Sequence, residues 1–105
     1  MKDNEIAVIK KFKSLLVPRV SIQDLKVFGS RARGEGTEYS DLDILVVVDY
    51  LDRELEKYII DCAWEAGFPD DILISPVILT RHQIEKTALR ESIFLKNADK
   101  EGIPA

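Results

Sequence analysis

The seven residues Leu42–Val48, with the sequence LDILVVV, constrain the fold of this chain more than any other segment. Branched aliphatic residues dominate the segment, and such residues favour β-strands. Asp43 is its one polar residue, so the segment predicts a central strand that is covered on both faces. The longest unbroken apolar run is residues 44–48. Because a membrane span needs about 20 apolar residues, no transmembrane segment is expected.

Helices are expected where apolar residues recur at helical spacing or where a capping pattern occurs. The first helical pattern stops before Pro18 and the second stops near Gly67, since both residue types terminate helices. The pattern TRHQ, beginning at Thr80, is typical of a helix N-terminus. These signals predict helices over residues 4–17, 52–66, about 81–90 and about 92–98, with one or two helical turns over 30–34.

Two shorter apolar segments, residues 24–28 and 72–79, predict further strands. Pro76 has no amide hydrogen, so the second of these strands is expected at a sheet edge or interrupted at the proline. The tail EGIPA, residues 101–105, is expected to be irregular. The interleaved order of helices and strands predicts an α/β or α+β sandwich with a small, mostly buried sheet.

The composition is that of one ordinary globular domain over residues 1–105. The net charge of −4 disfavours generic nucleic-acid binding, which usually needs a basic surface. Cys62 is the only cysteine, which excludes an internal disulfide and a thiolate metal cluster. The first residues, MKDNEIAVIKKF, lack the apolar core of a signal peptide. Together these features predict a cytoplasmic protein without membrane association.

Asp41 and Asp43 form the clearest candidate site. They are two residues apart at the start of the predicted central strand. On a strand they would share one face, with Cα atoms about 6.6 Å apart given a rise of about 3.3 Å per residue. Such a pair repels itself and suits a hard divalent cation, since Mg²⁺ prefers oxygen ligands. Taken alone, the pair is more typical of polar residues at a strand end.

Gly29 and Ser30 follow the strand predicted over residues 24–28. A glycine lets a backbone approach a ligand closely, and amides at a helix N-terminus favour phosphate. Arg31 and Arg33 are candidates to add positive charge near the same anion. Each of these residues alone is common in surface turns. Together with the two carboxylates they indicate metal-assisted phosphoryl or nucleotidyl transfer.

The segment GSRARGEGTEYSDLD fits a GS-x10-DxD signature and resembles the DNA polymerase β-like nucleotidyltransferase superfamily. The short chain without a second domain resembles its minimal nucleotidyltransferase (MNT) branch. The resemblance extends from the strand at 24–28 to the C-terminal FLKNADKEGIPA. It implies a mixed sheet backed by helices. It also implies that Gly29 and Ser30 contact nucleotide phosphates, and that Asp41 and Asp43 bind Mg²⁺.

The reaction that the resemblance implies is attack on the α-phosphate of a nucleoside triphosphate, with pyrophosphate leaving. ATP is the expected donor, and the expected acceptor is a macromolecule, since so short a chain has little room for an acceptor-binding domain. Small proteins of the MNT branch are often paired with a HEPN-domain partner in toxin–antitoxin systems. There the MNT protein acts as the antitoxin, in some cases by adenylylating its partner. The function of an antibiotic-modifying transferase fits this sequence less well, because the family members with that function are longer chains with a second domain.

The chain departs from the family pattern at one position. Active members usually place a third acidic residue on the strand that follows the DxD pair, as general base or additional metal ligand. Here that strand is 72–79, and Ser75 or Pro76 takes the expected place. Asp70 and Asp71 are candidates to substitute, although Asp and Pro also cluster in ordinary turns. The alternative function is therefore an antitoxin with this fold and little or no catalysis, which acts by binding its partner.

Three other polar or aromatic residues are conspicuous. Tyr39, in the loop before the DxD pair, is a candidate either to stack on a nucleotide base or to anchor the loop. Trp64 lies off the main apolar side of its predicted helix and is a candidate for an edge or an interface. His82 is the only histidine, and no catalytic partner for it is evident, so it is expected to be exposed.

Overall fold

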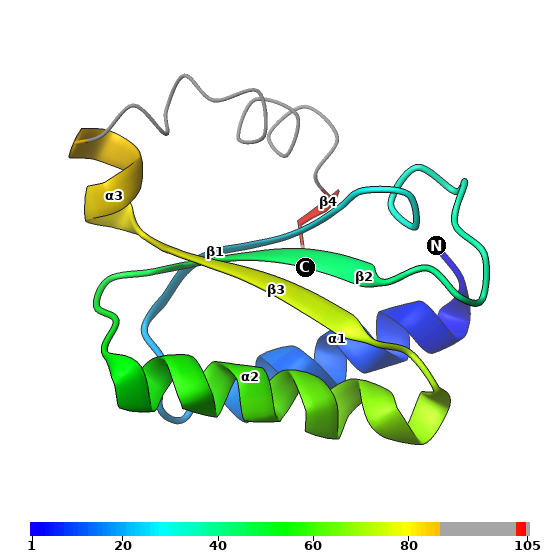
Figure 1. Cartoon of the computed structure of the whole chain (residues 1–105), viewed down its shortest axis with the longest axis horizontal. Helices are drawn as coiled ribbons and strands as arrows, with labels where there is room; N and C mark the ends of the chain where they lie inside the picture. The colour runs from blue at the N-terminus through cyan, green and yellow to red at the C-terminus, as the bar shows by residue number, and fades with distance from the viewer. Residues whose placement is uncertain (87–102, 105) are drawn as a thin grey trace.

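The computed structural model describes residues 1–86 and 103–104 and builds them around one four-stranded sheet (Figure 1). Helices α1 (Asp3–Leu16) and α2 (Arg53–Gly67) pack side by side on one face of the sheet. A 3-10 turn, η1 (Phe68–Asp70), follows α2, and a short helix, α3 (Arg81–Lys86), ends the first described range. Within these ranges, no helix combines the length and the apolar content that crossing a membrane requires.

The sheet is mixed, as the resemblance implied. The strands lie in the spatial order β3, β2, β1, β4, and their bounds are Ile74–Thr80, Leu42–Val48, Ile22–Phe28 and Ile103–Pro104. β2 pairs antiparallel with β1 and parallel with β3, while β1 pairs antiparallel with β4. Parallel neighbours need a crossover connection, and α2 provides it. β2 has its predicted bounds and its predicted central position, and β3, which contains Pro76, forms an edge of the described sheet.

Side chains of β2 alternate between the two faces of the sheet and are buried on both. Ile44 and Val46 are completely buried and share one core with Phe12 of α1. Leu45 and Val47 are buried on the opposite face. Burying an apolar side chain of this size contributes about 1.5–3 kcal/mol. The apolar residues on both faces of the strand are therefore buried, as the pattern predicted.

A glycine turns the chain sharply at the end of α2. A Cβ atom on Gly67 would lie 1.9 Å from the carbonyl oxygen of Ile72, so any side chain there would require a shift of the backbone. The amide of Ile72 donates to the carbonyl of Gly67 at 3.0 Å, and Asp71 closes the turn in the left-handed conformation with φ 53°. Leu42 then donates its amide to the carbonyl of Leu73 at 2.8 Å. This turn fixes where β3 begins beside β2.

The described C-terminal residues add a fourth strand to the sheet. The tail was expected to be irregular, yet Ile103–Pro104 form β4 and pair with Val27 and Lys26 of β1, so the expectation is wrong for these two residues. The physical reason is that β1 would otherwise present unpaired backbone groups along this edge. Of the helix expected over 81–90, α3 covers the first six residues. Its remainder and the helix expected over 92–98 lie outside the described residues.

Candidate active site

The carboxyl group of Asp43 marks the candidate site, near the start of the central strand. Its register partners are Phe28, the last residue of β1, and Ser75 in β3. Asp43 has the same parity along β2 as Leu45 and Val47, so its side chain lies on the face of the sheet away from α1 and α2. The site is therefore on the sheet face that the two long helices do not cover.

The turn after β1 lies directly against this carboxylate. Gly29 adopts φ +82°, in the left-handed region that only glycine enters without strain. A Cβ atom on Gly29 would lie 2.3 Å from Oδ2 of Asp43, so a larger residue would displace one of the two. The fold thus brings together residues from opposite ends of the GS-x10-DxD segment.

Two carboxylates and one guanidinium act on each other at the site. Burial raises the pKa of the Asp43 carboxyl, the negative charge of Asp41 raises it further, and Arg33 partly opposes both effects. Asp41 is exposed and lies one residue before β2 begins, rather than inside the strand. A divalent cation would relieve the repulsion, and Mg²⁺ is commonly held by one or two carboxylates together with substrate phosphates. The donor set of Asp41 and Asp43 fits this ion.

Ser30 follows Gly29 in the same turn and is half-buried. Its carbonyl oxygen accepts a hydrogen bond from the amide of Glu35 at 2.9 Å, and the carbonyl of Gly29 accepts one from the amide of Arg33 at 3.1 Å. These bonds close single turns, as expected for residues 30–34; the bond between Arg33 and Gly29 has the i to i+4 spacing of one helical turn, and no longer helix forms there. The two glycines and the polar residues of this segment favour turns over a helix. A phosphate at Ser30 would therefore meet a turn and not a helix N-terminus.

The two arginines of the segment have different surroundings. The side chain of Arg33 is 40% exposed, pairs with Glu35 at 3.0 Å and is the cation that acts on Asp43. Arg31 is buried, and its guanidinium donates to Glu5 and to the carbonyl oxygens of Glu38 and Ser40. The expectation that Arg31 adds charge near the phosphates is corrected accordingly, because its donors are used inside the fold.

Glu5 is a residue that the motif-based reasoning missed. It is 4% exposed and forms an ion pair with Arg31 at 2.9 Å. Burial raises the pKa of the Glu5 carboxyl, but hydrogen bonds from Arg31 and from the amide of Lys2 lower it by more, so the net shift is downward. The sequence did carry a signal: Glu5 precedes Ile9 and Phe12 at helical spacing, which places a carboxylate on the apolar side of α1.

Of the two residues expected at the place of a third acidic residue, Ser75 is the one that lies beside Asp43. Its Cα is paired directly with that of Asp43 in the parallel register, so both side chains emerge on the same face of the sheet. Asp70 and Asp71 belong to the turn between α2 and β3. Among the residues that the structure describes, no group of three or more His, Cys, Asp or Glu side chains is arranged to hold a metal ion. Neither aspartate of the turn therefore joins Asp41 and Asp43.

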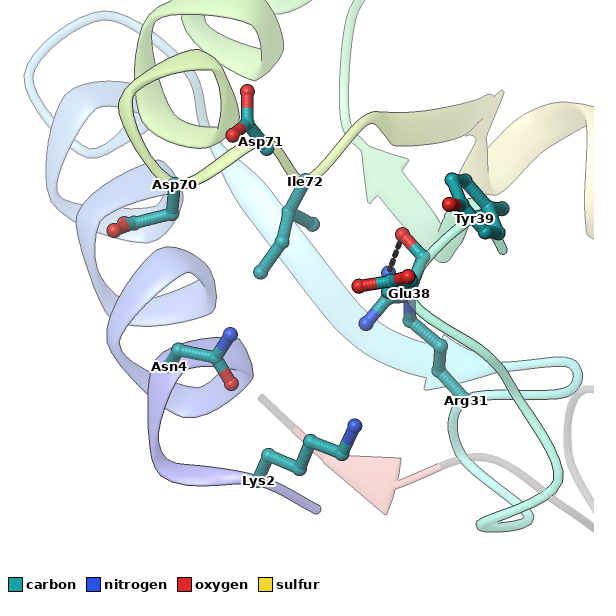
Figure 2. Close-up of a pocket in the computed structure, with 8 residues that line it drawn as sticks. All are labelled: Lys2, Asn4, Arg31, Glu38, Tyr39, Asp70, Asp71 and Ile72. Carbon is teal, nitrogen blue, oxygen red and sulfur yellow. Dashed lines mark hydrogen bonds between the residues drawn. The ribbon is translucent and has the colours of Figure 1, made fainter.

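Asp70 and Asp71 instead line a hollow of about 450 Å³ between the start of α1 and the turn after α2. Figure 2 shows Lys2 and Asn4 on one side of it and the two aspartates on the other. Tyr39 also lines the hollow and is 87% exposed, which does not fit the hypothesis that its ring anchors the loop. His82 is exposed, as expected. Trp64 is 55% exposed.

Comparison with known proteins bears on this site. The family model described as "Nucleotidyltransferase domain" matches residues 7–99, which is most of the chain. A protein of Methanocaldococcus jannaschii named "Putative protein adenylyltransferase MJ0128" is 34% identical over 93 residues, and the match covers 84% of this chain and 91% of that protein. "Protein adenylyltransferase MntA" of Thermococcus cleftensis is 32% identical over 96 residues, covering 85% of this chain and 90% of the relative.

A solved structure described as "Crystal structure of the toxin-antitoxin with AMP-PNP" is similar with a TM-score of 0.62 and 20% identity, over 96% of this chain and 71% of that chain. At this identity the likeness shows the fold alone. The fold and the family model together define an enzyme class, the transferases of nucleotidyl groups. This chain belongs to the nucleotidyltransferase domain family, and the names of its relatives agree with the resemblance to the MNT branch.

Proposed function

We propose that this nucleotidyltransferase is a Mg²⁺-dependent protein adenylyltransferase, which transfers AMP from ATP to a protein acceptor. The names of the relatives support the adenylyl group and the protein acceptor. The observation that carries the proposal is the contact of Gly29 with the carboxylate of Asp43. The turn proposed to bind phosphate thus lies directly beside Asp43, one of the two carboxylates proposed to bind metal.

The residues have distinct roles in this proposal. Gly29 and Ser30 would hold the phosphates, since a glycine allows close approach and a turn presents backbone donors. Arg33 would add a positive charge beside them. Asp41 and Asp43 would hold Mg²⁺, which when bound neutralises charge on the phosphates. The site residues thereby orient the α-phosphate of ATP toward the acceptor.

The transfer forms a bond between an acceptor oxygen and the α-phosphorus and breaks the bond from that phosphorus to the bridging oxygen, so that pyrophosphate leaves. Among the described residues, Ser75 stands opposite Asp43 where a general base would be expected. The acceptor proton therefore has no dedicated carboxylate at this position and passes to water. Slow transfer is expected, with positioning and charge neutralisation as the main contributions.

We propose further that the acceptor is a HEPN-domain protein and that the two form a toxin–antitoxin pair. The solved toxin–antitoxin structure that this fold resembles supports that context. The alternative is an antitoxin that neutralises its partner by binding alone. Ser75, in the place of the third acidic residue, is the observation that favours this alternative.

The experiment is incubation with α-³²P-ATP, Mg²⁺ and a candidate HEPN-domain partner protein. Wild type is compared with Asp43→Asn, which keeps the shape of the side chain and removes its charge. Label on the partner with wild type only supports adenylyl transfer through the acidic pair. If neither wild type nor Asp43→Asn labels the partner, and Asp43→Asn still neutralises it fully, the protein is an antitoxin that acts by binding and not an enzyme.

A further inference from the structure

A buried ion pair connects the start of α1 with the loop that carries the candidate site. Nη1 of Arg31 donates to Oε2 of Glu5 at 2.9 Å, and each side chain is 5% exposed. The amide of Lys2 donates to Oε1 of the same Glu5 at 2.8 Å. Buried charges are costly unless they are paired and hydrogen-bonded, and both conditions are met here. The pair therefore anchors the start of the loop over residues 30–41 to α1.

The other donors of Arg31 hold the far end of the same loop. Nε donates to the carbonyl oxygen of Ser40 at 2.7 Å, and Nη2 donates to that of Glu38 at 3.3 Å, a bond drawn in Figure 2. Arg31 directly follows Ser30 in the chain, and Ser40 directly precedes Asp41. One side chain thus ties the turn of Ser30 to the residue before the first carboxylate.

The backbone of the loop also packs onto Arg31. A Cβ atom on Gly36 would lie 2.8 Å from Cγ of Arg31 and 3.2 Å from its Cα. The amides of Glu35 and Gly36 both donate to the carbonyl oxygen of Ser30, at 2.9 and 3.1 Å. The loop is therefore packed around the ion-paired side chain of Arg31.

We propose that Glu5 and Arg31 are positioning residues, which hold Ser30 and Asp41 at the separation that binding of Mg²⁺ and a nucleotide requires. The inference rests on the proposed function, because that function assigns Ser30 to the phosphates and Asp41 to the metal. Each side chain is 5% exposed, and Nε, Nη1 and Nη2 of Arg31 all donate to groups within the fold, so the proposed role of the pair is to position other residues and not to contact the nucleotide. Residues that orient ligand-binding groups in this way typically change affinity or activity by about 10–100-fold when replaced.

The test measures binding of AMP-PNP with Mg²⁺ by isothermal titration calorimetry. Arg31→Met removes every donor but keeps an unbranched side chain, and Glu5→Gln keeps the shape and removes the charge. Ile59→Ala is the matched control, because it cuts a cavity in the core beneath α2, far along the chain from the loop. About a 10-fold or greater loss of affinity is expected in both loop variants. Wild-type affinity is expected for Ile59→Ala, at a temperature where every variant is folded.

A second readout follows the loop itself, without nucleotide. Amide hydrogen exchange over residues 30–41 is expected to be faster in Arg31→Met and Glu5→Gln than in wild type, relative to the exchange of β2. If Arg31→Met does not fold, Glu5→Gln decides the question. Wild-type affinity and loop exchange in a folded loop variant overturn the positioning role. Failure of wild type to bind AMP-PNP with Mg²⁺ refutes the proposed function itself, and the positioning role falls with it.

Discussion

The backbone of Gly29 lies so close to the carboxylate of Asp43 that a Cβ atom on the glycine would be 2.3 Å from Oδ2. The contact follows from the antiparallel register, since β1 ends at Phe28 directly opposite Asp43. It joins the turn proposed for phosphate to the carboxylate proposed for metal. Residue 29 is thus constrained twice, by its φ of +82° and by the space beside Asp43.

Gly29→Ala is expected to weaken binding of AMP-PNP with Mg²⁺ by about 10-fold or more, because the new methyl group displaces the carboxylate. It is also expected to destabilise the fold by more than the 1–2 kcal/mol or so that the left-handed conformation costs a residue with a Cβ. Calorimetric titration measures the first effect and urea unfolding the second.

Gly34→Ala separates the two constraints on residue 29. Gly34 has a similar φ of +76°, and nothing lies within 4 Å of a Cβ built on it. This variant should show the conformational strain alone, about 1 kcal/mol, with nucleotide affinity close to that of wild type. If both variants lose affinity equally, the contact with Asp43 is irrelevant to binding.

The ion pair of Glu5 predicts a pH dependence of stability. The pKa of the Glu5 carboxyl is lowered, so the native state binds fewer protons than the unfolded state on acidification. The stabilisation is therefore complete above the ordinary pKa of 4.5 and is lost as the pH falls through the lowered value. Glu5→Gln, which leaves the charge of Arg31 unpaired, is expected to cost about 3–5 kcal/mol at pH 7.

Urea unfolding of wild type and Glu5→Gln between about pH 7 and pH 3 measures this dependence. The difference in the free energy of unfolding should be constant near neutral pH and should narrow as the pH falls below the ordinary pKa of 4.5 and then through the lowered pKa of Glu5 in the native state. A difference that stays the same down to pH 3 would show that the charge of Glu5 contributes nothing.

Gly36→Ala tests the packing of the loop onto Arg31 without changing a charge. The added methyl group would meet Cγ of Arg31 at 2.8 Å and its backbone at 3.2 Å, so the loop has to move. Overpacking of this kind commonly costs about 1–3 kcal/mol. Stability and nucleotide affinity are both expected to fall, and the comparison is again Gly34→Ala. Unchanged affinity despite lower stability would confine Gly36 to a structural role.

The central strand was predictable because its apolar pattern leaves few alternatives. A segment such as LDILVVV is apolar on both faces, and only a central position covers both. The approach of Gly29 to Asp43 could not be predicted in the same way, because it depends on the register that pairs Phe28 with Asp43. Register comes from packing. The sequence left Ser75 and Pro76 as alternatives opposite the acidic pair, and the parallel register selects Ser75.

The ion pair between Glu5 and Arg31 was not predictable from the motif. It joins residues 26 positions apart, and a side chain as polar as arginine is normally expected at the surface. Its burial depends on a partner supplied by α1. The pairing of Ile103–Pro104 with β1 is equally non-local, and two residues are too few to give a strand pattern. In both cases the deciding contact lies far away in the sequence.

Ser75→Asp is the most direct test of the altered acidic position. The new carboxylate would stand opposite Asp43 on the neighbouring strand, where like charges destabilise by about 0.2–1 kcal/mol. Stability is therefore expected to fall in the presence of EDTA. Mg²⁺ or Mn²⁺ should raise the melting temperature of this variant by more than that of wild type, because a third carboxylate adds an oxygen ligand.

Ser75→Asn is the matched control for that variant, since it has the same shape without the charge. It should show neither the loss of stability in EDTA nor the additional response to metal. Transfer of label from α-³²P-ATP is expected to be faster in Ser75→Asp than in Ser75→Asn, because the carboxylate offers a base for the acceptor proton. Equal metal responses in the two variants would mean that residue 75 does not face the acidic pair in solution. An antitoxin that acts by binding alone would then explain better why residue 75 is a serine, because residue 75 has no catalytic role in such a protein.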